Sequence, residues 1–215
     1  MKHFFHSDSA FFQKLTIFSD LVLLNLLTIL CSLPLFTVGT SITALYYAVT
    51  RLRQQDDAHL FRAFFHSFRE NFRQSVILWL LLLPVGVGAF ICILLYDQIN
   101  MPFLLACSVL ALVVCGIAAS WLFPMLARFH STVPQALKNA LLCGSTYLPL
   151  SLAMTLVNLI PLALFLIVPG IFTALGCVWL FIWFSLAAYC NCGLLESPFS
   201  AIVPTCDTVS PRGSQ

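Results

Sequence analysis

Residues 75–96 read SVILWLLLLPVGVGAFICILLY and contain no charged side chain. A membrane-spanning helix needs about 20 mostly apolar residues, because each residue rises about 1.5 Å and the hydrocarbon layer is about 30 Å thick. A second uncharged stretch, residues 102–126, follows the short connection at residues 97–100. A short connection makes neighbouring helices antiparallel, so this part of the chain predicts a helical hairpin in a membrane.

The composition of the whole chain agrees with this prediction. Of its 215 residues, 60% are hydrophobic and 8% are charged, whereas a soluble domain carries about 25% charged residues. A chain with so little charge cannot cover a soluble globule with polar surface, so we expect the lipid bilayer to surround it. The net charge of +2 gives no argument for a nucleic-acid partner.

Two further apolar regions extend the pattern. Residues 147–168 and 171–189 predict a second hairpin, joined at Pro169 and Gly170. Residues 15–50 would form one helix of about 54 Å, which is too long for a single span.

Pro34 and Gly39 interrupt that first region. Proline blocks straight continuation of a helix and glycine permits a sharp reversal. We therefore predict a first span at residues 16–33, a turn, and a short second helix that ends near Tyr47. That second helix either crosses a thinned membrane at a tilt or is partly re-entrant.

Residues 58–74 predict an amphipathic helix in the membrane interface. One face carries phenylalanine rings and the opposite face carries basic side chains, both at steps of three and four. The rings should face lipid and Arg62, Arg69 and Arg73 should contact lipid headgroups. A weaker copy at residues 132–143 precedes the second hairpin, so the order of interfacial helix, span, turn and span occurs twice.

The basic residues set the predicted orientation, because they gather on the cytoplasmic side of membrane proteins. With six spans, residues 1–14 form a cytoplasmic N-terminal segment, residues 15–194 one transmembrane domain, and residues 195–215 a disordered cytoplasmic tail. All ten basic residues are then cytoplasmic. An alternative with five spans places Lys2 and Lys14 outside.

Polar residues inside the predicted spans are the candidates for function. Asp20 and Asn25 lie in the first span, and Arg128 lies at the inner end of the fourth. Asp20 could form an ion pair with Arg128 or with an interfacial arginine, near the inner mouth of a cavity. Alternatively, Asp20 reaches headgroup water and Arg128 extends to the interface. Further asparagines are expected to form hydrogen bonds between helices, namely Asn71, Asn139 and Asn158.

Enzyme signatures are missing from the sequence, which contains no zinc-protease, serine-hydrolase or phosphate-loop motif. The nine cysteines are odd in number, and most lie in apolar runs, where a thiol packs like a small hydrophobic group. Cys190 and Cys192 form a single Cys-x-Cys pair in the sequence, which is weak evidence for a metal site. We therefore expect no enzyme activity, cofactor or metal.

Four motifs resemble the YesL family of bacterial membrane proteins, whose activity is not established. They are Asp20-x4-Asn25-Leu26-Leu27, Leu33-Pro34-x2-Thr37-x-Gly39-x4-Ala44-Leu45-Tyr46-Tyr47, Phe64-x3-Phe68-x2-Asn71-Phe72 and Phe123-Pro124-x3-Arg128-Phe129. The resemblance covers residues 10–194 and implies a multi-pass protein of the bacterial cell membrane, often encoded beside sugar-uptake genes. It implies no catalytic residue.

The resulting hypothesis is an accessory or regulatory component of carbohydrate uptake that contacts a sugar permease complex through its helices. The alternative is a small-solute transporter in its own right, with Asp20 and Asn25 along its path.

Overall fold

A computed structural model describes residues 5–54, 60–96, 101–129, 132–167 and 182–196. Within these ranges the chain forms helices and no strand, which confirms the predicted all-α class there. The elements are α1 (Phe5–Cys31), the 3-10 turn η1 (Leu35–Thr37), α2 (Val38–Arg53), α3 (Leu60–Leu94), α5 (Pro102–Arg128), α6 (Val133–Thr146) and α7 (Leu148–Ile167), followed by a helix at residues 182–196.

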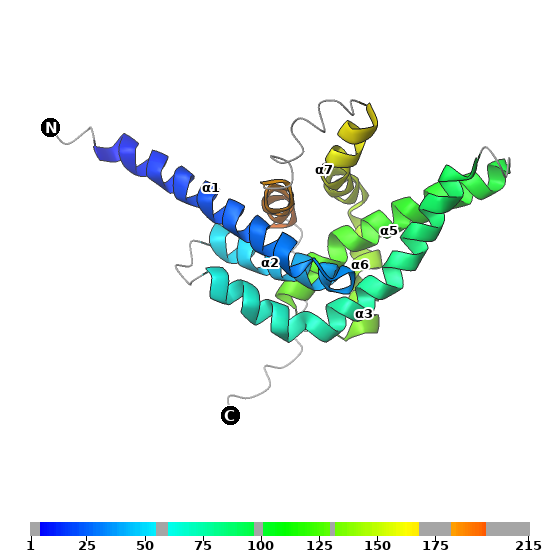
Figure 1. The fold of residues 1–215 in the computed structure, drawn as a ribbon, viewed down its shortest axis with the longest axis horizontal. Helices are drawn as coiled ribbons and strands as arrows, with labels where there is room; N and C mark the ends of the chain where they lie inside the picture. The colour runs from blue at the N-terminus through cyan, green and yellow to red at the C-terminus, as the bar shows by residue number, and fades with distance from the viewer. Residues whose placement is uncertain (1–4, 55–59, 97–100, 130–131, 168–181, 197–215) are drawn as a thin grey trace.

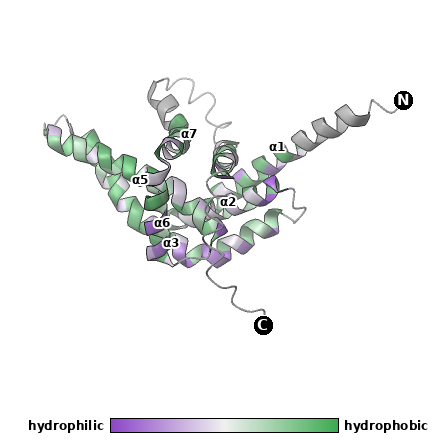
Figure 2. Ribbon diagram, turned by 180° about the vertical axis from the view of Figure 1, so that it is seen from behind, coloured by the Kyte–Doolittle hydropathy of each residue, from purple (hydrophilic) through white to green (hydrophobic). Residues whose placement is uncertain are grey.

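Helix α2 lies at the centre of the molecule (Figure 1). It packs against α1, α3 and α5, and α5 in turn packs against α6 and α7. The last part of α3 and the first part of α5 run side by side away from this centre, and we call this hairpin the α3–α5 arm (Figure 1). Hydrophobic residues cover the arm, whereas hydrophilic residues gather along the lower edge of the molecule (Figure 2).

Two helices in the described ranges, α3 and α5, are long and apolar enough to cross a membrane. They cover residues 75–94 and 102–126 of the predicted hairpin, whose connection at residues 97–100 lies outside the described residues. A third span exists if α6 and α7, which meet at an angle of 105°, count as one broken span. These helices indicate a membrane protein. The apolar part of α1, Leu15–Cys31, is shorter than the other two, and most of the predicted last span, 171–189, lies outside the described residues.

The predicted boundary between an interfacial helix at residues 58–74 and a span at residue 75 was wrong. Helix α3 runs without a break from Leu60 to Leu94, because no proline or glycine separates the basic part from the apolar part. The prediction that the rings face lipid was also wrong in part. Phe64 is fully buried, and Phe65 and Phe68 pack against the same core. Phe61 and Phe72 remain exposed.

The turn between α1 and α2 also differs from the prediction. Its chain reversal is complete before Gly39, which lies inside α2. Pro34 begins the turn, and the Thr37 hydroxyl donates to the carbonyls of Cys31 and Pro34, both at 2.6 Å. The Trp79 indole Nε1 of α3 donates to the Leu35 carbonyl at 2.9 Å and so fastens the turn to α3. At the other end, α1 begins at Phe5, ten residues before the predicted boundary at residue 15.

Small side chains allow α2 to occupy the centre. A Cβ atom added to Gly39 would lie 2.6 Å from the Trp79 Cβ and 2.9 Å from the Ser75 carbonyl oxygen. Ala44 and Ala48 on the same helix are completely buried. Small residues let helix backbones approach closely, which is the main source of helix association in lipid. Gly39 is therefore needed for close packing, and its freedom to turn is not used.

Helix α6 (Val133–Thr146) lies where the sequence predicts the second interfacial helix, at residues 132–143. Thr132 and Gln135 form a capping box at its start. Ala136, Ala140 and Gly144 form a buried face, and a Cβ atom on Gly144 would lie 2.6 Å from Ile117 of α5. Ala136 and Ala140 belong to a second core cluster around Trp121, whereas Phe123 of α5 belongs to the first, so α5 joins the two clusters.

We predict that Gly39→Ala lowers the stability of the protein in detergent by about 1–3 kcal/mol, because the new methyl group overpacks the contact between α2 and α3. The matched control is Gly88→Ala on α3, where an added Cβ meets nothing within 4 Å. The control should leave the thermal unfolding midpoint unchanged or raise it, since alanine favours a helix over glycine by about 1 kcal/mol. Equal midpoints for the two variants would contradict the packing role of Gly39.

Candidate functional site

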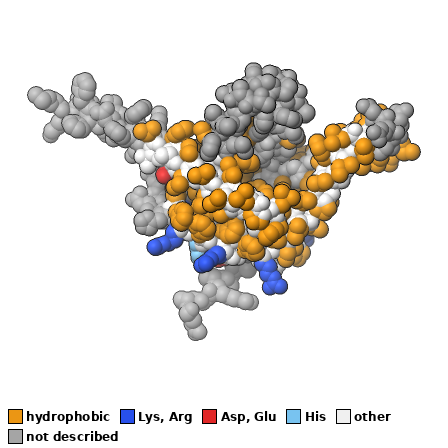
Figure 3. Space-filling view, in the orientation of Figure 1, with side chains coloured by type: hydrophobic (Ala, Val, Ile, Leu, Met, Phe, Trp, Pro, Cys, Tyr) orange, Lys and Arg blue, Asp and Glu red, His pale blue; other side chains and the backbone are white. Residues whose placement is uncertain are grey.

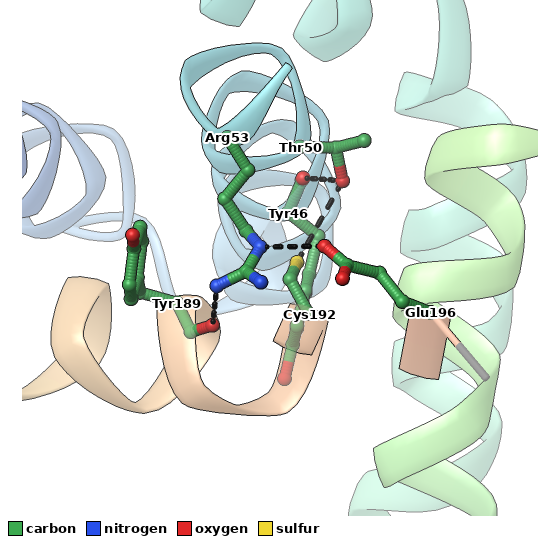
Figure 4. A network of polar contacts seen from close by, with 6 residues as sticks. All are labelled: Tyr46, Thr50, Arg53, Tyr189, Cys192 and Glu196. Carbon is green, nitrogen blue, oxygen red and sulfur yellow. Dashed lines mark hydrogen bonds and ion pairs between the residues drawn. The ribbon is translucent and has the colours of Figure 1, made fainter. Parts of the chain in front are cut away.

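The last turns of α2 meet the helix at residues 182–196 in a network of polar contacts (Figure 4). The Arg53 Nε donates to Glu196 Oε1 at 2.8 Å, and its Nη1 donates to the Tyr189 carbonyl at 3.4 Å. The guanidinium also lies over the Tyr189 ring, 4.7 Å from its centroid. These contacts fix the direction of the Arg53 side chain.

The hydrogen bond from Arg53 lowers the pKa of Glu196, and the charge of Arg128 acts in the same direction. Glu196 is therefore ionised at neutral pH. Because its side chain is 56% exposed, solvent screens the pair, and its contribution to stability is at most about 1 kcal/mol. The pair aligns the two helices more than it stabilises them.

Cys192 lies on the buried side of this network. Its thiol is 3.6 Å from the Thr50 hydroxyl, which donates to the Tyr46 carbonyl at 2.8 Å. Burial raises the pKa of Cys192, so the thiol stays neutral. Cys190 is exposed, so the two cysteines of the sequence pair lie in different environments. No group of His, Cys, Asp or Glu side chains in the described ranges is placed to hold a metal ion.

A chain of side-chain hydrogen bonds crosses four helices. The Asn191 amide donates to the Tyr46 hydroxyl at 3.0 Å and to Asn158 Oδ1 at 3.1 Å. The Asn158 amide donates onward to the Ser120 hydroxyl at 3.4 Å. Tyr46 and Asn191 are buried, whereas Asn158 is exposed on α7. The chain therefore connects the interior of the bundle with its surface.

Two buried side-chain oxygens of the helix at residues 182–196, Ser185 Oγ and Asn191 Oδ1, have no hydrogen-bond partner among the described residues. Ser185 also donates its backbone N–H to Asn25 Oδ1 at 3.2 Å. Asn25 is completely buried in α1. Asn25 therefore holds the first turns of the helix at residues 182–196, whereas Arg53 holds its later turns.

The structure places two of the predicted site residues, Asp20 and Asn25, on α1 and the third, Arg128, on α5. Asp20 is half-buried. Arg128 is the last residue of α5. Of the asparagines expected between helices, Asn158 fulfils that role, whereas Asn71 bonds to Ser67 of its own helix and Asn139 is exposed.

Arg128 lines a pocket of about 340 Å³ between the C-terminal ends of α2 and α5. The Arg51 Nη2 donates to the Tyr47 hydroxyl at 2.8 Å, and the guanidinium lies 5.2 Å from the centroid of that ring. The side chains that line the pocket are Tyr47, Thr50, Arg51, Gln54, Ala127 and Arg128. None of them is acidic.

The predicted headgroup contacts, Arg62, Arg69 and Arg73, are all exposed on the first half of α3. Figure 3 shows Lys and Arg side chains along the lower edge of the molecule, below a broad hydrophobic surface. Their contact with lipid stays a prediction.

Sequence reasoning missed Arg51, Arg53, Asn191 and Glu196 as site residues. A signal for Arg51 was present, because Tyr47 lies four residues earlier, on the same helical face. Asn191 and Glu196 carry no comparable signal, since their partners on α2, Tyr46 and Arg53, are more than a hundred residues away in the sequence.

Residues 21–97 match the family model described as a protein of unknown function, DUF624. The resemblance to the YesL family is consistent with this match. No curated protein and no solved structure matches the chain. The matched segment includes α2, and with it the residues that α2 contributes to the polar network and to the pocket. Arg128, Asn191 and Glu196 lie beyond it.

We predict that Asn191→Ala destabilises the protein, because it leaves the Tyr46 hydroxyl and Asn158 Oδ1 without a donor. A hydrogen bond lost between helices in a membrane costs about 0.6–2 kcal/mol. Asn139→Ala, at an exposed position on α6, is the control and should change the unfolding midpoint little. The two midpoints would be measured by thermal unfolding in one detergent, and equal losses would refute a specific role for Asn191.

Proposed function

We propose that this chain is a non-enzymatic integral membrane protein of the bacterial cell membrane. It acts as an accessory or regulatory component of carbohydrate uptake and contacts the helices of a sugar permease complex. The observation that carries this proposal is the exposed α3–α5 arm. In the most apolar 18-residue stretch of α3, only 11% of the residues are buried inside the structure, and in that of α5 only 17% are.

The arm offers a large apolar surface to other membrane components. Val87 on α3 is 48% exposed, and Leu110 on α5 is 64% exposed. The arm also projects away from the rest of the molecule (Figure 1), so a partner helix could lie beside it without displacing α1 or α7. The link to sugar uptake rests on the resemblance to the YesL family.

We further propose six spans with both termini in the cytoplasm. Support comes from the described basic residues after α1, which lie at the ends of α2 and α5, in the first half of α3 and on α6. Helix α2 would be the short second span. Its buried Thr40, Ser41 and Thr43 are compatible with a helix that other helices shield from lipid.

For the orientation, single cysteines would replace Ser7, Asp97 and Ser210 in a cysteine-free background. A membrane-impermeant thiol reagent should label position 97 in intact cells, and positions 7 and 210 only after lysis. Labelling of position 7 in intact cells would favour five spans. Labelling of position 210 without lysis would contradict the orientation taken from the basic residues.

For the partner, a photo-reactive amino acid would replace Leu110 or Val87 in native membranes, with the fully buried Leu122 as the control position. Leu110 and Val87 should give a covalent adduct with a transmembrane subunit of a sugar permease, and Leu122 should give none. Adducts with lipid alone, or with a second copy of this chain, would count against the accessory role.

The alternative function is transport of a small solute by this protein alone. The hydrogen-bonded chain from Tyr46 through Asn191 to Asn158 favours it, because it places polar groups across the bundle. Asn191 Oδ1 has no hydrogen-bond partner in the described part of the chain. Solute flux into liposomes that contain only the purified protein would support transport. Flux that needs the permease partner would support the accessory role.

A further inference from the structure

The first half of α3 carries a strip of exposed arginines. Arg62, Arg69 and Arg73 are seven and four residues apart, so they lie on one side of the helix. Within the ranges that the structure describes, none of the three forms a hydrogen bond or an ion pair. The acidic side chain of α3, Glu70, lies 3.4 Å from His66 instead. The strip therefore presents its positive charges to the surroundings of the molecule.

A second exposed strip, made of phenylalanine rings, runs beside the arginines. Phe61 is 56% exposed and Phe72 is 37% exposed. Each of them directly precedes an arginine of the strip, and consecutive residues of a helix point about 100° apart. The half-buried Phe65 extends this flank, since its ring centroid lies 4.9 Å from that of Phe61.

The remaining sides of this part of α3 differ from both strips. The side opposite the arginines packs into the protein, where Phe64, Ser67 and Asn71 are buried. The flank opposite the rings carries the polar side chains of Glu70 and Gln74. Around the helix axis, the order is therefore protein core, rings, arginines and polar side chains. This order is typical of a helix in a membrane surface, with its rings among acyl chains and its polar edge toward water.

The course of α3 places these strips at the level of lipid headgroups. The helix continues without a break from Arg73 into the apolar arm, and Ile77, about one turn later, is 47% exposed. The first half of α3 also runs along the lower edge of the molecule (Figure 1), where hydrophilic residues gather (Figure 2). Basic side chains next to a lipid-facing stretch extend into the interface.

We propose that this surface binds anionic phospholipids. Arg62, Arg69 and Arg73 contact the phosphate groups, and Phe61 and Phe72 insert among the upper parts of the acyl chains. Planar guanidinium groups suit phosphate oxygens, and an anionic leaflet attracts each basic side chain at its surface. The inference is independent of the accessory role, because the lipid surface lies on the first half of α3 whereas the arm is formed by its last part.

The test is photo-crosslinking of the full-length protein in vesicles of phosphatidylglycerol and phosphatidylcholine in equal amounts. Benzoylphenylalanine replaces Phe72, and mass spectrometry measures the adducts with each lipid. Phosphatidylglycerol adducts should be about fivefold or more in excess, since one basic side chain near an anionic surface contributes about 1 kcal/mol. The matched control position is Phe103 on α5, which is 80% exposed and should react with both lipids nearly equally.

Two changes should remove the preference at position 72. The combination of Arg62→Gln, Arg69→Gln and Arg73→Gln should lower the ratio of the two adducts to about one. Lys138→Gln, which removes an exposed charge from α6, should change the ratio less than about twofold. Salt at about 1 M should act on the unchanged arginines as the triple variant does, because the Debye length falls to about 3 Å. This second measurement does not depend on how the variant folds.

The orientation of the rings is tested on the polar flank, where benzoylphenylalanine in place of Gln74 should give few lipid adducts. The proposal fails if position 72 reacts only with protein, or equally with both lipids, or if the preference survives the triple variant. It also fails if position 74 gives as many lipid adducts as position 72. The accessory role is tested separately, at Val87 and Leu110 on the arm.

Discussion

The structure depends on how closely α3 and α5 approach α2. In lipid, apolar side chains gain little from leaving their surroundings, so helices associate through close contact and hydrogen bonds. Trp79 and Phe123 pack so close to Gly39 that a side chain at this position would overlap them. The Thr43 hydroxyl lies 3.0 Å from the Ser75 hydroxyl. This approach places the C-terminal end of α2 beside that of α5. The polar network and the arginine pocket both follow from it.

The sequence predicts the apolar helices well, because their length and lack of charge follow directly from the thickness of a membrane. It predicts the junctions less well. The Phe face at residues 61–72 was assigned to lipid, since a single sequence cannot tell whether a neighbouring helix or lipid covers an apolar face. The structure places Phe64 inside a protein core. Gly39 was assigned to a turn for the same reason, because a glycine needed for contact and one needed for reversal look identical in sequence.

The candidate site was predicted only in fragments. Arg128 and Asn25 stood out, because polar residues in apolar runs are costly. The sequence did not predict their neighbours. Asn25 accepts a hydrogen bond from the backbone N–H of Ser185, and Arg128 lines the same pocket as Arg51. Such pairings depend on the order in which helices pack, which hydropathy does not encode. The residue pairs that join the helices are also far apart in sequence. These pairs are Arg53 with Glu196 and Tyr46 with Asn191.

The unbroken course of α3 has a mechanical consequence. One helix carries Arg62, Arg69 and Arg73 at its beginning and forms the apolar arm at its end. Its 35 residues span about 52 Å at about 1.5 Å per residue. Pivoted at its basic end, such a rod moves its far end by about 5 Å when it tilts by about 5°. Because both ends belong to one helix, a tilt of its basic end would be passed on to the apolar arm.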